Sequence, residues 1–449
     1  MLNRLRSFLI LSCVLLVSAT AYSQDLAKPV SKVTLADGDS IVFLGDSITH
    51  QCLYTQYVED FLYTRFPTNR FKIHNAGVGG ARAWDALARF DADVAAYKPK
   101  YVTILLGMND GSYQPFNQDI FDTYKQDMTE LLSRLDSIGA ISIPMTPTMF
   151  DSRASVIGKR ERDPAMLREY NSVLTYYGTW LRELATDEGR GFVDMWGPLN
   201  NITFEQRKQD ANFTLIKDAV HPDAPGQVVM AAAIITDLGF PRQVSNIRVS
   251  ADLNGDVNAT ATGGKVTNIL ITDDTVSFSW KANSLPWVVP AEAQPGAVLT
   301  KLGHKLSKES LEVHGLAPGK YQLKIDDKVV GVYTNVQLAR HIELQENAKT
   351  PQHQQATYVA ELNKQRNAGP VRSMRGQWSQ FQRYARSKRA AEADLKNEAA
   401  VAELEKWTEQ IKGMDNRVAE FNAAAKLIED EIYKTNQPIS RKYVIKKVK

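Results

Sequence analysis

The chain has 449 residues, a length that predicts two or three domains because a single hydrophobic core rarely extends so far. Its formal net charge is +3, so no overall field favours nucleic acid or a membrane surface as a partner. The two cysteines, and the absence of Cys-x-x-Cys and His-Glu-x-x-His motifs, argue against a disulfide scaffold and give no support for a zinc site.

The first 23 residues have the layout of a secretory signal peptide. Arg4 and Arg6 precede an apolar run over 8–17 that is too short to span a bilayer, and small residues follow it. We expect cleavage near residues 21–23, and export to the periplasm or the extracellular space. A retained anchor is the alternative. No other apolar run approaches membrane length, so we expect no membrane span after cleavage.

Residues 30–242 are predicted to form an α/β domain. Short apolar runs alternate there with amphipathic stretches, and this alternation indicates a parallel sheet covered by helices. The predicted strands are 41–44, 71–74, 101–106, 140–143 and 191–194, and the predicted helices include 121–136, 165–185 and 226–238.

Residues 245–340 are predicted to form a small β-sandwich. The segments 268–280 and 311–334 have the pattern of hairpins with Asp-Asp, Pro-Gly and Asp-Asp-Lys turns. Within this region "DLNGD" (252–256) is similar to the start of a calcium loop. The glycine and glutamate required at the sixth and twelfth positions are absent, so we expect no calcium site.

Residues 348–436 are predicted to be helical, starting from an N-cap and first-turn pair at Thr350 and Pro351. Apolar residues recur at alternating spacings of three and four from Leu404 to Ile432, the pattern of a coiled-coil seam. Because Gly413 interrupts the seam, we expect a helical hairpin packed on the body.

The segment 364–389 contains eight lysines or arginines and no acid, interleaved with aromatic residues. It could bind an anionic polymer. The interpretation we favour is a helix with one apolar face in the core and a solvated basic face. The last residues, 437–449, are expected to form a basic tail.

The first predicted strand runs directly into Gly45-Asp46-Ser47. Gly45 permits a sharp exit from the strand, which places Ser47 at the carboxyl end of a central strand, where open α/β sheets bind their ligands. The alternative is that Asp46 and Ser47 only cap the following helix.

A nucleophilic serine needs a base and a group that orients the base. Among the three histidines of this domain, His50 has no carboxylate at motif spacing. His74 ends a strand and is expected to point into packing or into the neighbouring turn. His221 differs, because Asp218 lies three residues before it. On a turn, this spacing can bring the carboxylate to Nδ1 and leave Nε2 free to face Ser47.

Two further strand ends carry groups that suit an oxyanion hole. The glycines of "NAGVGGARAWD" (75–85) allow backbone N–H groups to turn inward, and Asn109 in "GMND" (107–110) offers a side-chain amide. Taken alone, the glycines could form an ordinary loop, and Asn109 could form an Asx-turn. Together with Gly-Asp-Ser and Asp-x-x-His-Pro, they predict a serine-hydrolase site.

These four motifs resemble the four sequence blocks of the SGNH, or GDSL-type, hydrolases. The resemblance covers the first domain only and implies a flavodoxin-like three-layer fold for it. The first block reads Gly-Asp-Ser-Ile rather than Gly-Asp-Ser-Leu, a conservative departure. The implied site residues are Ser47, Asp218 and His221 for the catalytic relay, and Ser47, Gly80 and Asn109 for the oxyanion hole. Gly80 is preferred to Gly79 because it ends the second block.

The resemblance implies ester hydrolysis through an acyl-enzyme, without a metal or an organic cofactor. We expect short acyl groups, such as acetyl, on a carbohydrate, because the chain has export features, an added β module and no continuous apolar lid. Asp46, Trp84 and the loop 144–163 are expected to shape the substrate site. The alternatives are a lysophospholipase or thioesterase-type acylhydrolase, an acyltransferase, and a cell-surface scaffold with an inactive hydrolase domain.

Overall fold

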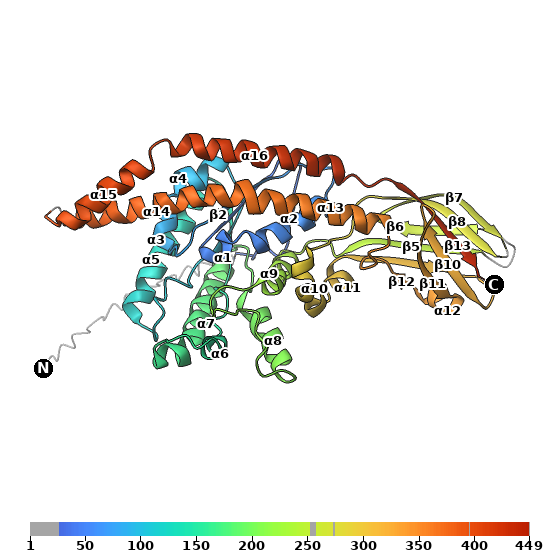
Figure 1. Cartoon of the computed structure of the whole chain (residues 1–449), viewed down its shortest axis with the longest axis horizontal. Helices are drawn as coiled ribbons and strands as arrows, with labels where there is room; N and C mark the ends of the chain where they lie inside the picture. The colour runs from blue at the N-terminus through green and yellow to red at the C-terminus, as the bar shows by residue number, and fades with distance from the viewer. Residues whose placement is uncertain (1–26, 252–256, 273, 395, 449) are drawn as a thin grey trace, which may run out of the picture.

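The computed structural model describes residues 27–251, 257–272, 274–394 and 396–448. The predicted signal peptide and the segment 252–256 lie outside these residues. Figure 1 shows an elongated molecule with an α/β domain towards one end, a β module at the other and long C-terminal helices along one side. Among the described residues, no helix combines the length and apolarity needed to cross a bilayer.

The α/β domain contains a four-stranded sheet in the order β2-β1-β3-β4, and all of its strands are parallel, as predicted. The central strand β1 is buried along its whole length. Its alternate residues enter two separate cores, Ile41 and Phe43 on one face and Val42 and Leu44 on the other. The strands are β1 (Ser40–Gly45), β2 (Lys72–Gly77), β3 (Tyr101–Leu105) and β4 (Ile141–Pro144).

Helices cover both faces of this sheet and give the predicted three-layer arrangement. Helices α2 (Leu53–Arg65) and α9 (Ala224–Asp237) pack into one core, and α5 (Gln118–Ser137) and α7 (Pro164–Asp187) pack into the other. The shorter helices of the domain are α1 (Ser47–His50), α3 (Ala83–Ala88), α4 (Phe90–Asp93), η1 (Ala95–Tyr97), α6 (Ser152–Ile157) and α8 (Trp196–Arg207).

The prediction of a fifth strand at 191–194 is wrong. This segment forms only two isolated bridges, Val30 with Gly191 and Met145 with Val193. The chain turns away at Asp194, whose carboxylate accepts a hydrogen bond of 2.9 Å from the backbone N–H of Gly197 in α8. Pairing therefore stops before a strand can extend.

The β module consists of two sheets that share one apolar core. A five-stranded sheet has the order β11-β10-β13-β8-β7, and a four-stranded sheet has the order β12-β9-β5-β6. The strands are β5 (Gln243–Ala251), β6 (Val257–Thr262), β7 (Gly264–Thr272), β8 (Thr275–Ala282), β9 (Lys308–Val313), β10 (Lys320–Ile325), β11 (Lys328–Thr334), β12 (Ile342–Glu343) and β13 (Ser440–Lys447); helix α12 (Asn335–Arg340) follows β11.

Two of the predicted hairpins form, and one does not. Strands β7 and β8 pair, and so do β10 and β11, where Asp326 and Asp327 have positive φ angles of 48° and 64°. Such angles match a type I′ hairpin turn. The turn at Pro318-Gly319 joins no hairpin, because β9 and β10 lie in different sheets.

The prediction of a basic tail at 437–449 is also wrong. Residues Ser440–Lys447 form β13, which pairs with β10 on one side and β8 on the other. Tyr443 and Ile445 are buried in the module's core, and Tyr443 stacks on Phe278 with ring centroids 5.0 Å apart. The alternation of these apolar residues with lysine and arginine is that of a strand with one buried face. The last part of the chain therefore completes a sheet whose first strand begins at Gly264.

Between β8 and β9 the chain leaves the β module and packs on the first domain. Three short helices lie there: η2 (Ala291–Ala293), α10 (Gln294–Thr300) and α11 (Leu302–Leu306). Trp287, Leu302 and Leu306 join the core that contains α9. The prediction of a plain β-sandwich over 245–340 missed this apolar interface.

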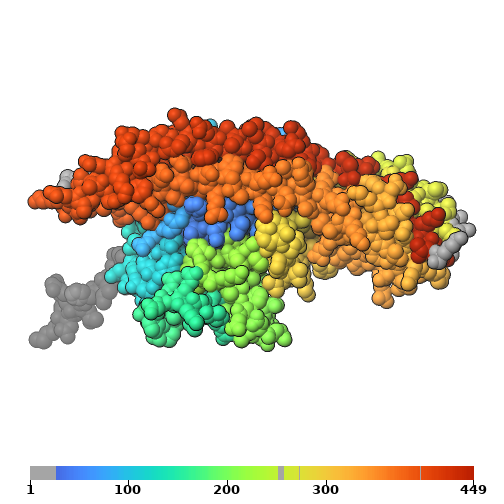
Figure 2. Space-filling view, viewed as in Figure 1, coloured from blue at the N-terminus to red at the C-terminus, as the bar shows by residue number. Residues whose placement is uncertain are grey.

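The C-terminal helices form a long arm that returns on itself. A hairpin was predicted with its break at Gly413, but the chain reverses earlier, between the helices 372–393 and 398–410 (Figure 1). Thr350 caps the first helix, and Gly413, with φ 69°, separates the last two. Figure 2 shows most of the arm lying against the first domain, while the end coloured for residues near 400 projects beyond it. Its helices are α13 (Pro351–Arg366), the π-helical turn η3 (Asn367–Val371), α14 (Arg372–Ala393), α15 (Glu398–Gln410) and α16 (Met414–Thr435).

The basic segment 364–389 has the predicted apolar face, since Met374 and Trp378 enter a core of the first domain. Its basic face is not simply solvated, and here the prediction is wrong. Three of its arginines pair with carboxylates of the first domain: Arg366 with Glu59 at 3.1 Å, Arg375 with Asp93 at 2.6 Å and Arg386 with Asp85 at 2.7 Å. Acidic groups on the domain complement this helix face.

Candidate active site

Ser47 lies at the carboxyl edge of the parallel sheet, where β1 ends and α1 begins. Asp46 caps α1, and its carboxylate accepts a hydrogen bond of 2.9 Å from the N–H of Ile48. The short helix lies so close to the strand ends that a Cβ at Gly45 would be 2.1 Å from Thr49 Oγ1, and one at Gly77 would be 2.3 Å from His50 N. Glycine at both positions lets the serine approach the sheet.

His221 and Asp218 complete a relay with Ser47. His221 Nε2 lies 2.8 Å from Ser47 Oγ, and His221 Nδ1 lies 2.7 Å from Asp218 Oδ2. The other oxygen of Asp218 accepts hydrogen bonds from the N–H groups of Val220 and His221. The structure thus brings together the three residues that were predicted from motifs far apart in the sequence.

The surroundings of this relay shift the pKa values of both partners. The hydrogen bond that the His221 ring donates to Asp218 raises the pKa of His221, although burial opposes the change. Burial alone would raise the pKa of Asp218, but the hydrogen bonds from His221 and the backbone lower it overall. The carboxylate therefore stays ionised and favours a protonated imidazole beside it.

The predicted oxyanion donors lie on the next two loops. Gly80 is exposed and has φ +69°. Within the described residues its N–H has no protein acceptor, whereas the N–H of Gly79 is donated to His50 Nδ1 at 3.1 Å. The free N–H distinguishes Gly80 from Gly79 as the available donor.

The side chain of Asn109 reaches back to the first two strand ends. Its Nδ2 lies 3.1 Å from Ala81 O and 3.4 Å from Asp46 Oδ2, and its Oδ1 accepts a hydrogen bond of 3.2 Å from the Tyr113 hydroxyl. Tyr113 was not predicted. No sequence motif marks it, although it orients the Asn109 amide.

Asp46 is positioned differently from the prediction of a substrate contact. It is only 1 % exposed, and its carboxylate is occupied in capping α1. Burial raises its pKa to about 7, although the hydrogen bond from Ile48 opposes the shift. The alternative considered from the sequence, a helix cap, describes what this residue does in the structure.

A cavity of about 840 Å³ opens beside Gly80 and Asn109, between the first domain and α14, and its lining does not include Ser47 or His221. Trp84 lines it, as predicted, and the Arg389 guanidinium lies over the Trp84 ring at 4.4 Å. The predicted loop 144–163 does not contribute to its lining. Its lining includes Gly80, Trp84, Asn109, Tyr113, Arg386 and Arg389.

The other two histidines of the domain are held in place as neutral or packed groups. Burial lowers the pKa of His50 to about 4, and three neighbouring arginines act in the same direction. His74 stacks on Tyr97 with centroids 3.5 Å apart, the packing role predicted for it. Across the described ranges, no three side chains of His, Cys, Asp or Glu gather in a group that could hold a metal ion.

Known proteins are similar to the first domain. Residues 43–229 match the model of the GDSL-like Lipase/Acylhydrolase family. The acetylxylan esterase of Geobacillus stearothermophilus is 26% identical over 228 residues, which cover 46% of this chain and 96% of that protein.

Two solved structures are similar over different extents. One is a gut microbial diltiazem-metabolizing enzyme with a TM-score of 0.78 and 26% identity, and the match covers 94% of this chain and 100% of that one. The other is Axe2, an acetylxylan esterase from Geobacillus stearothermophilus, with a TM-score of 0.38 and 25% identity over 46% of this chain and 98% of its own. The first match extends over all three parts of the molecule.

Proposed function

Because residues 43–229 form a GDSL-like acylhydrolase domain of the SGNH type, we propose that this protein is a serine esterase in which Ser47 is the nucleophile. The observation that carries the proposal is the continuous relay from Ser47 Oγ to His221 Nε2 at 2.8 Å and from His221 Nδ1 to Asp218 at 2.7 Å. Such a relay allows a hydroxyl to lose its proton as it attacks.

In the first half of the reaction, Ser47 Oγ attacks the ester carbonyl carbon while His221 Nε2 accepts the hydroxyl proton. The carbonyl oxygen becomes an oxyanion that accepts hydrogen bonds from the N–H groups of Ser47 and Gly80 and from the Asn109 amide. His221 then donates its proton to the departing alcohol, and the acyl group remains on Ser47.

In the second half, His221 takes a proton from a water molecule as the water oxygen attacks the acyl carbon. The same three donors hold the second oxyanion, and the carboxylic acid leaves as the proton returns to Ser47 Oγ. Asp218 stays ionised throughout, which supports the imidazolium formed in each step.

We further propose that the substrate carries a short acyl group, such as acetyl, on a carbohydrate or a similarly polar alcohol. An acetylxylan esterase is among the relatives, and the cavity beside the oxyanion donors is large enough for a group of drug or disaccharide size. The charged residues of its lining are Arg82, Asp85, Asp127, Arg386 and Arg389. Such a lining suits the hydroxyl groups of a polar alcohol better than a long acyl chain. Export of the mature protein is part of the same proposal.

A fluorophosphonate probe tests the nucleophile. We expect the wild-type protein and Ser133→Ala, a control at an exposed serine of the same domain, to be labelled, and Ser47→Ala to remain unlabelled. Labelling of Ser47→Ala would refute the assignment. If none of the three proteins is labelled, the scaffold with an inactive domain is favoured instead.

An ester series tests the substrate class. Nitrophenyl esters of increasing acyl length and acetylated xylo-oligosaccharides are compared by kcat/KM, and the Ser47→Ala protein gives the background rate. The proposal predicts the highest values for acetyl esters and a steep fall with chain length. A preference for long chains would favour a lysophospholipase-type activity, and product analysis would detect transfer to another alcohol.

A further inference from the structure

Three side chains of the C-terminal helix α14 contact the loop that carries Gly80. We call residues 77–80 the glycine loop. Arg375, Gln382 and Arg386 are spaced by seven and four residues, so they share one face of α14. Each donates a hydrogen bond to a backbone carbonyl of the glycine loop.

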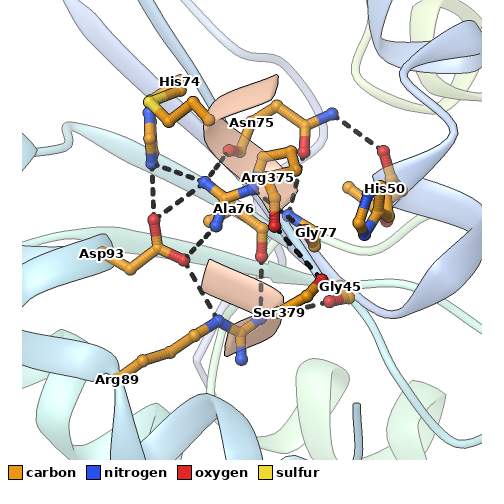
Figure 3. Close-up of polar contacts among 12 residues, drawn as sticks. Gly45, His50, His74, Asn75, Ala76, Gly77, Arg89, Asp93, Arg375 and Ser379 are labelled. Carbon is orange, nitrogen blue, oxygen red and sulfur yellow. Dashed lines mark hydrogen bonds and ion pairs between the residues drawn. The ribbon is translucent and has the colours of Figure 1, made fainter. Parts of the chain in front are cut away.

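Arg375 anchors this helix face in the first domain. Its side chain is fully buried, and its Nε donates to Gly77 O at 3.0 Å while its guanidinium pairs with Asp93. Figure 3 shows the guanidinium between Asp93 on one side and the end of β2 on the other. Because a buried ion pair is held by charge on both sides, α14 has little freedom to shift relative to β2.

Gln382 contacts one particular peptide group of the glycine loop. Its Nε2 donates to Gly79 O at 3.0 Å, and its side chain is buried. The carbonyl of Gly79 and the N–H of Gly80 belong to the same planar trans peptide, so they point in opposite directions. Holding the carbonyl towards α14 therefore turns the Gly80 N–H away from the helix.

Arg386 holds the next peptide group in the same way. Its guanidinium donates to Gly80 O at 2.7 Å and forms two hydrogen bonds with Asp85, at 2.7 and 2.8 Å. Asp85 also accepts the N–H of Arg82 at 2.8 Å, which connects this contact to the start of α3.

The opposite side of the glycine loop is held by the first domain itself. The N–H of Gly77 is donated to Asn75 Oδ1 at 2.9 Å, and that of Val78 to Gly45 O at 3.1 Å. Gly79 N–H is donated to His50. In the described part of the chain, Gly80 N–H alone among the four has no protein acceptor.

We propose that α14 is part of the catalytic apparatus and that Gln382 is a positioning residue, which sets the Gly79–Gly80 peptide so that the Gly80 N–H faces the oxyanion. The inference rests on the proposed function, because it takes Gly80 as an oxyanion donor. It gives the C-terminal arm a role in rate as well as in stability. A glycine with φ +69° has no side chain that could restrict its own peptide. The turn hydrogen bond from Ala81 N–H to Val78 O, at 3.1 Å, and the contact from Gln382 both restrain this peptide.

The test compares Gln382→Ala and Gln382→Glu with wild type in the full chain. Alanine removes the donor, and glutamate keeps the size of the side chain but cannot donate when ionised at about pH 8. Gln377→Ala is the matched control, because Gln377 lies on the same helix and contacts Arg417 rather than the loop. An acetyl ester is the substrate, and an arylboronic acid, which becomes tetrahedral on the serine, is the inhibitor.

We expect both Gln382 variants to lose about tenfold in kcat, with KM and the melting temperature close to those of wild type, because a donor displaced rather than removed costs less than its deletion. The inhibition constant of the boronic acid should rise by the same factor as kcat falls. Gln377→Ala should match wild type in all of these measurements.

The inference would be overturned by kcat within twofold of wild type in both variants. It would also be overturned if kcat fell only together with the melting temperature, or if boronate affinity did not change. An inactive wild-type protein, by contrast, would refute the proposed function before any Gln382 variant was examined. The two failures are therefore distinguishable.

Discussion

Asp218 and His221 lie 2.7 Å apart at the edge of the sheet, and Asp93 and His74 lie 2.9 Å apart beneath α14. The two Asp–His distances are similar, but the pKa values of the two histidines are shifted in opposite directions. The pKa of His221 is raised, mainly by its hydrogen bond to Asp218, whereas the pKa of His74 is lowered, mainly by burial. The same two residue types thus give a histidine with a raised pKa in one place and a packed ring with a lowered pKa in the other.

The difference comes from what else surrounds each carboxylate. Asp218 has no arginine partner within the described residues, and the side chains of its pair are each 31 % exposed. Asp93 is fully buried and pairs with Arg375 at 2.6 Å and Arg89 at 3.1 Å (Figure 3). Burial alone would raise the pKa of Asp93, but Arg375 and His74 lower it to about 2.

An Asp–His contact therefore does not by itself define a catalytic pair. Two arginines balance the charge of Asp93, so that carboxylate has little effect left for stabilising a protonated His74. Solvent access and an uncompensated carboxylate make His221 suited to accept and return a proton. Substitution of Asp218 should therefore change mainly the rate, and substitution of Asp93 should change mainly the stability.

Asp218→Asn should have the largest effect on turnover. The asparagine cannot stabilise the imidazolium or hold the required tautomer, so kcat should fall about 10³- to 10⁴-fold, with the melting temperature little changed. The measurement is steady-state hydrolysis of an acetyl ester. Asp223→Asn, which retains the cap of α9 in the same loop, is the control and should keep the wild-type rate. A loss below tenfold in Asp218→Asn would contradict the relay.

Asp93→Asn should show the reverse pattern. It leaves Arg375 and Arg89 buried without their carboxylate, which should lower the free energy of unfolding by about 3–5 kcal/mol. Denaturant unfolding measures this change, and kcat of the folded protein should fall far less than in Asp218→Asn. An unchanged unfolding midpoint would show that this pair does not stabilise the fold.

Asn109→Ala should reduce the rate by removing an oxyanion donor. We expect kcat to fall about 10²- to 10³-fold with little change in stability. Asn117→Ala is a useful control, because Asn117 caps α5 through its side chain. That variant should lose about 1 kcal/mol of stability and no activity. Equal activity in Asn109→Ala and wild type would remove Asn109 from the site.

The acid limb of the pH–rate profile should report His221. The base must be neutral to accept a proton, and its raised pKa means that activity falls as the pH drops through a value above the ordinary 6.5. In Asp218→Asn the partner that raises this pKa is weakened. The acid limb of the residual activity should therefore lie at a lower pH than in wild type. The profile of kcat/KM against pH, recorded for wild type and for Asp218→Asn, measures the acid limb of each protein. A limb that does not move would show that Asp218 does not set it.

The two histidines should contribute opposite pH dependences to stability, and this is the smallest effect expected. The contribution of His221, whose folded pKa is raised, is complete below the ordinary pKa of 6.5 and is lost as the pH rises through the folded value. For His74 the folded pKa is lowered, so the unfolded chain takes up a proton first, and stability falls as the pH drops below about 6.5.

His74→Gln keeps a donor towards Asp93 and removes the titrating ring. Its free energy of unfolding should therefore decrease less than that of wild type between about pH 7 and pH 5. Denaturant unfolding at the two pH values measures the difference. An identical decrease in both proteins would mean that His74 contributes nothing to acid sensitivity.

The sequence predicted which residues of the first domain gather at the sheet edge. Gly-Asp-Ser, the glycine-rich loop and Gly-Met-Asn-Asp each follow a strand, and parallel strands bring their carboxyl ends to one edge. Asp218 and His221 are near neighbours, so a local turn suffices to join them. Each of these features depends on short stretches of chain, whose patterns are visible in a single sequence.

Contacts between distant segments were not predictable in the same way. Nothing local to Arg375 indicates that its charge pairs with Asp93, and nothing local to Gln382 indicates that it donates to Gly79. The alternating pattern of 440–447 is that of a strand, but its pairing with β8 and β10 depends on where the C-terminal arm ends.

Four parallel strands, their carboxyl ends and the residues that lie there were thus predictable from local patterns, because hydrophobic period and turn chemistry act over a few residues. The solvent access of one Asp–His pair, the burial of the other and the packing of α14 on the glycine loop became visible only in the folded chain. Burial and charge pairing depend on segments hundreds of residues apart, and the same side chains acquire different pKa values and different roles according to those neighbours.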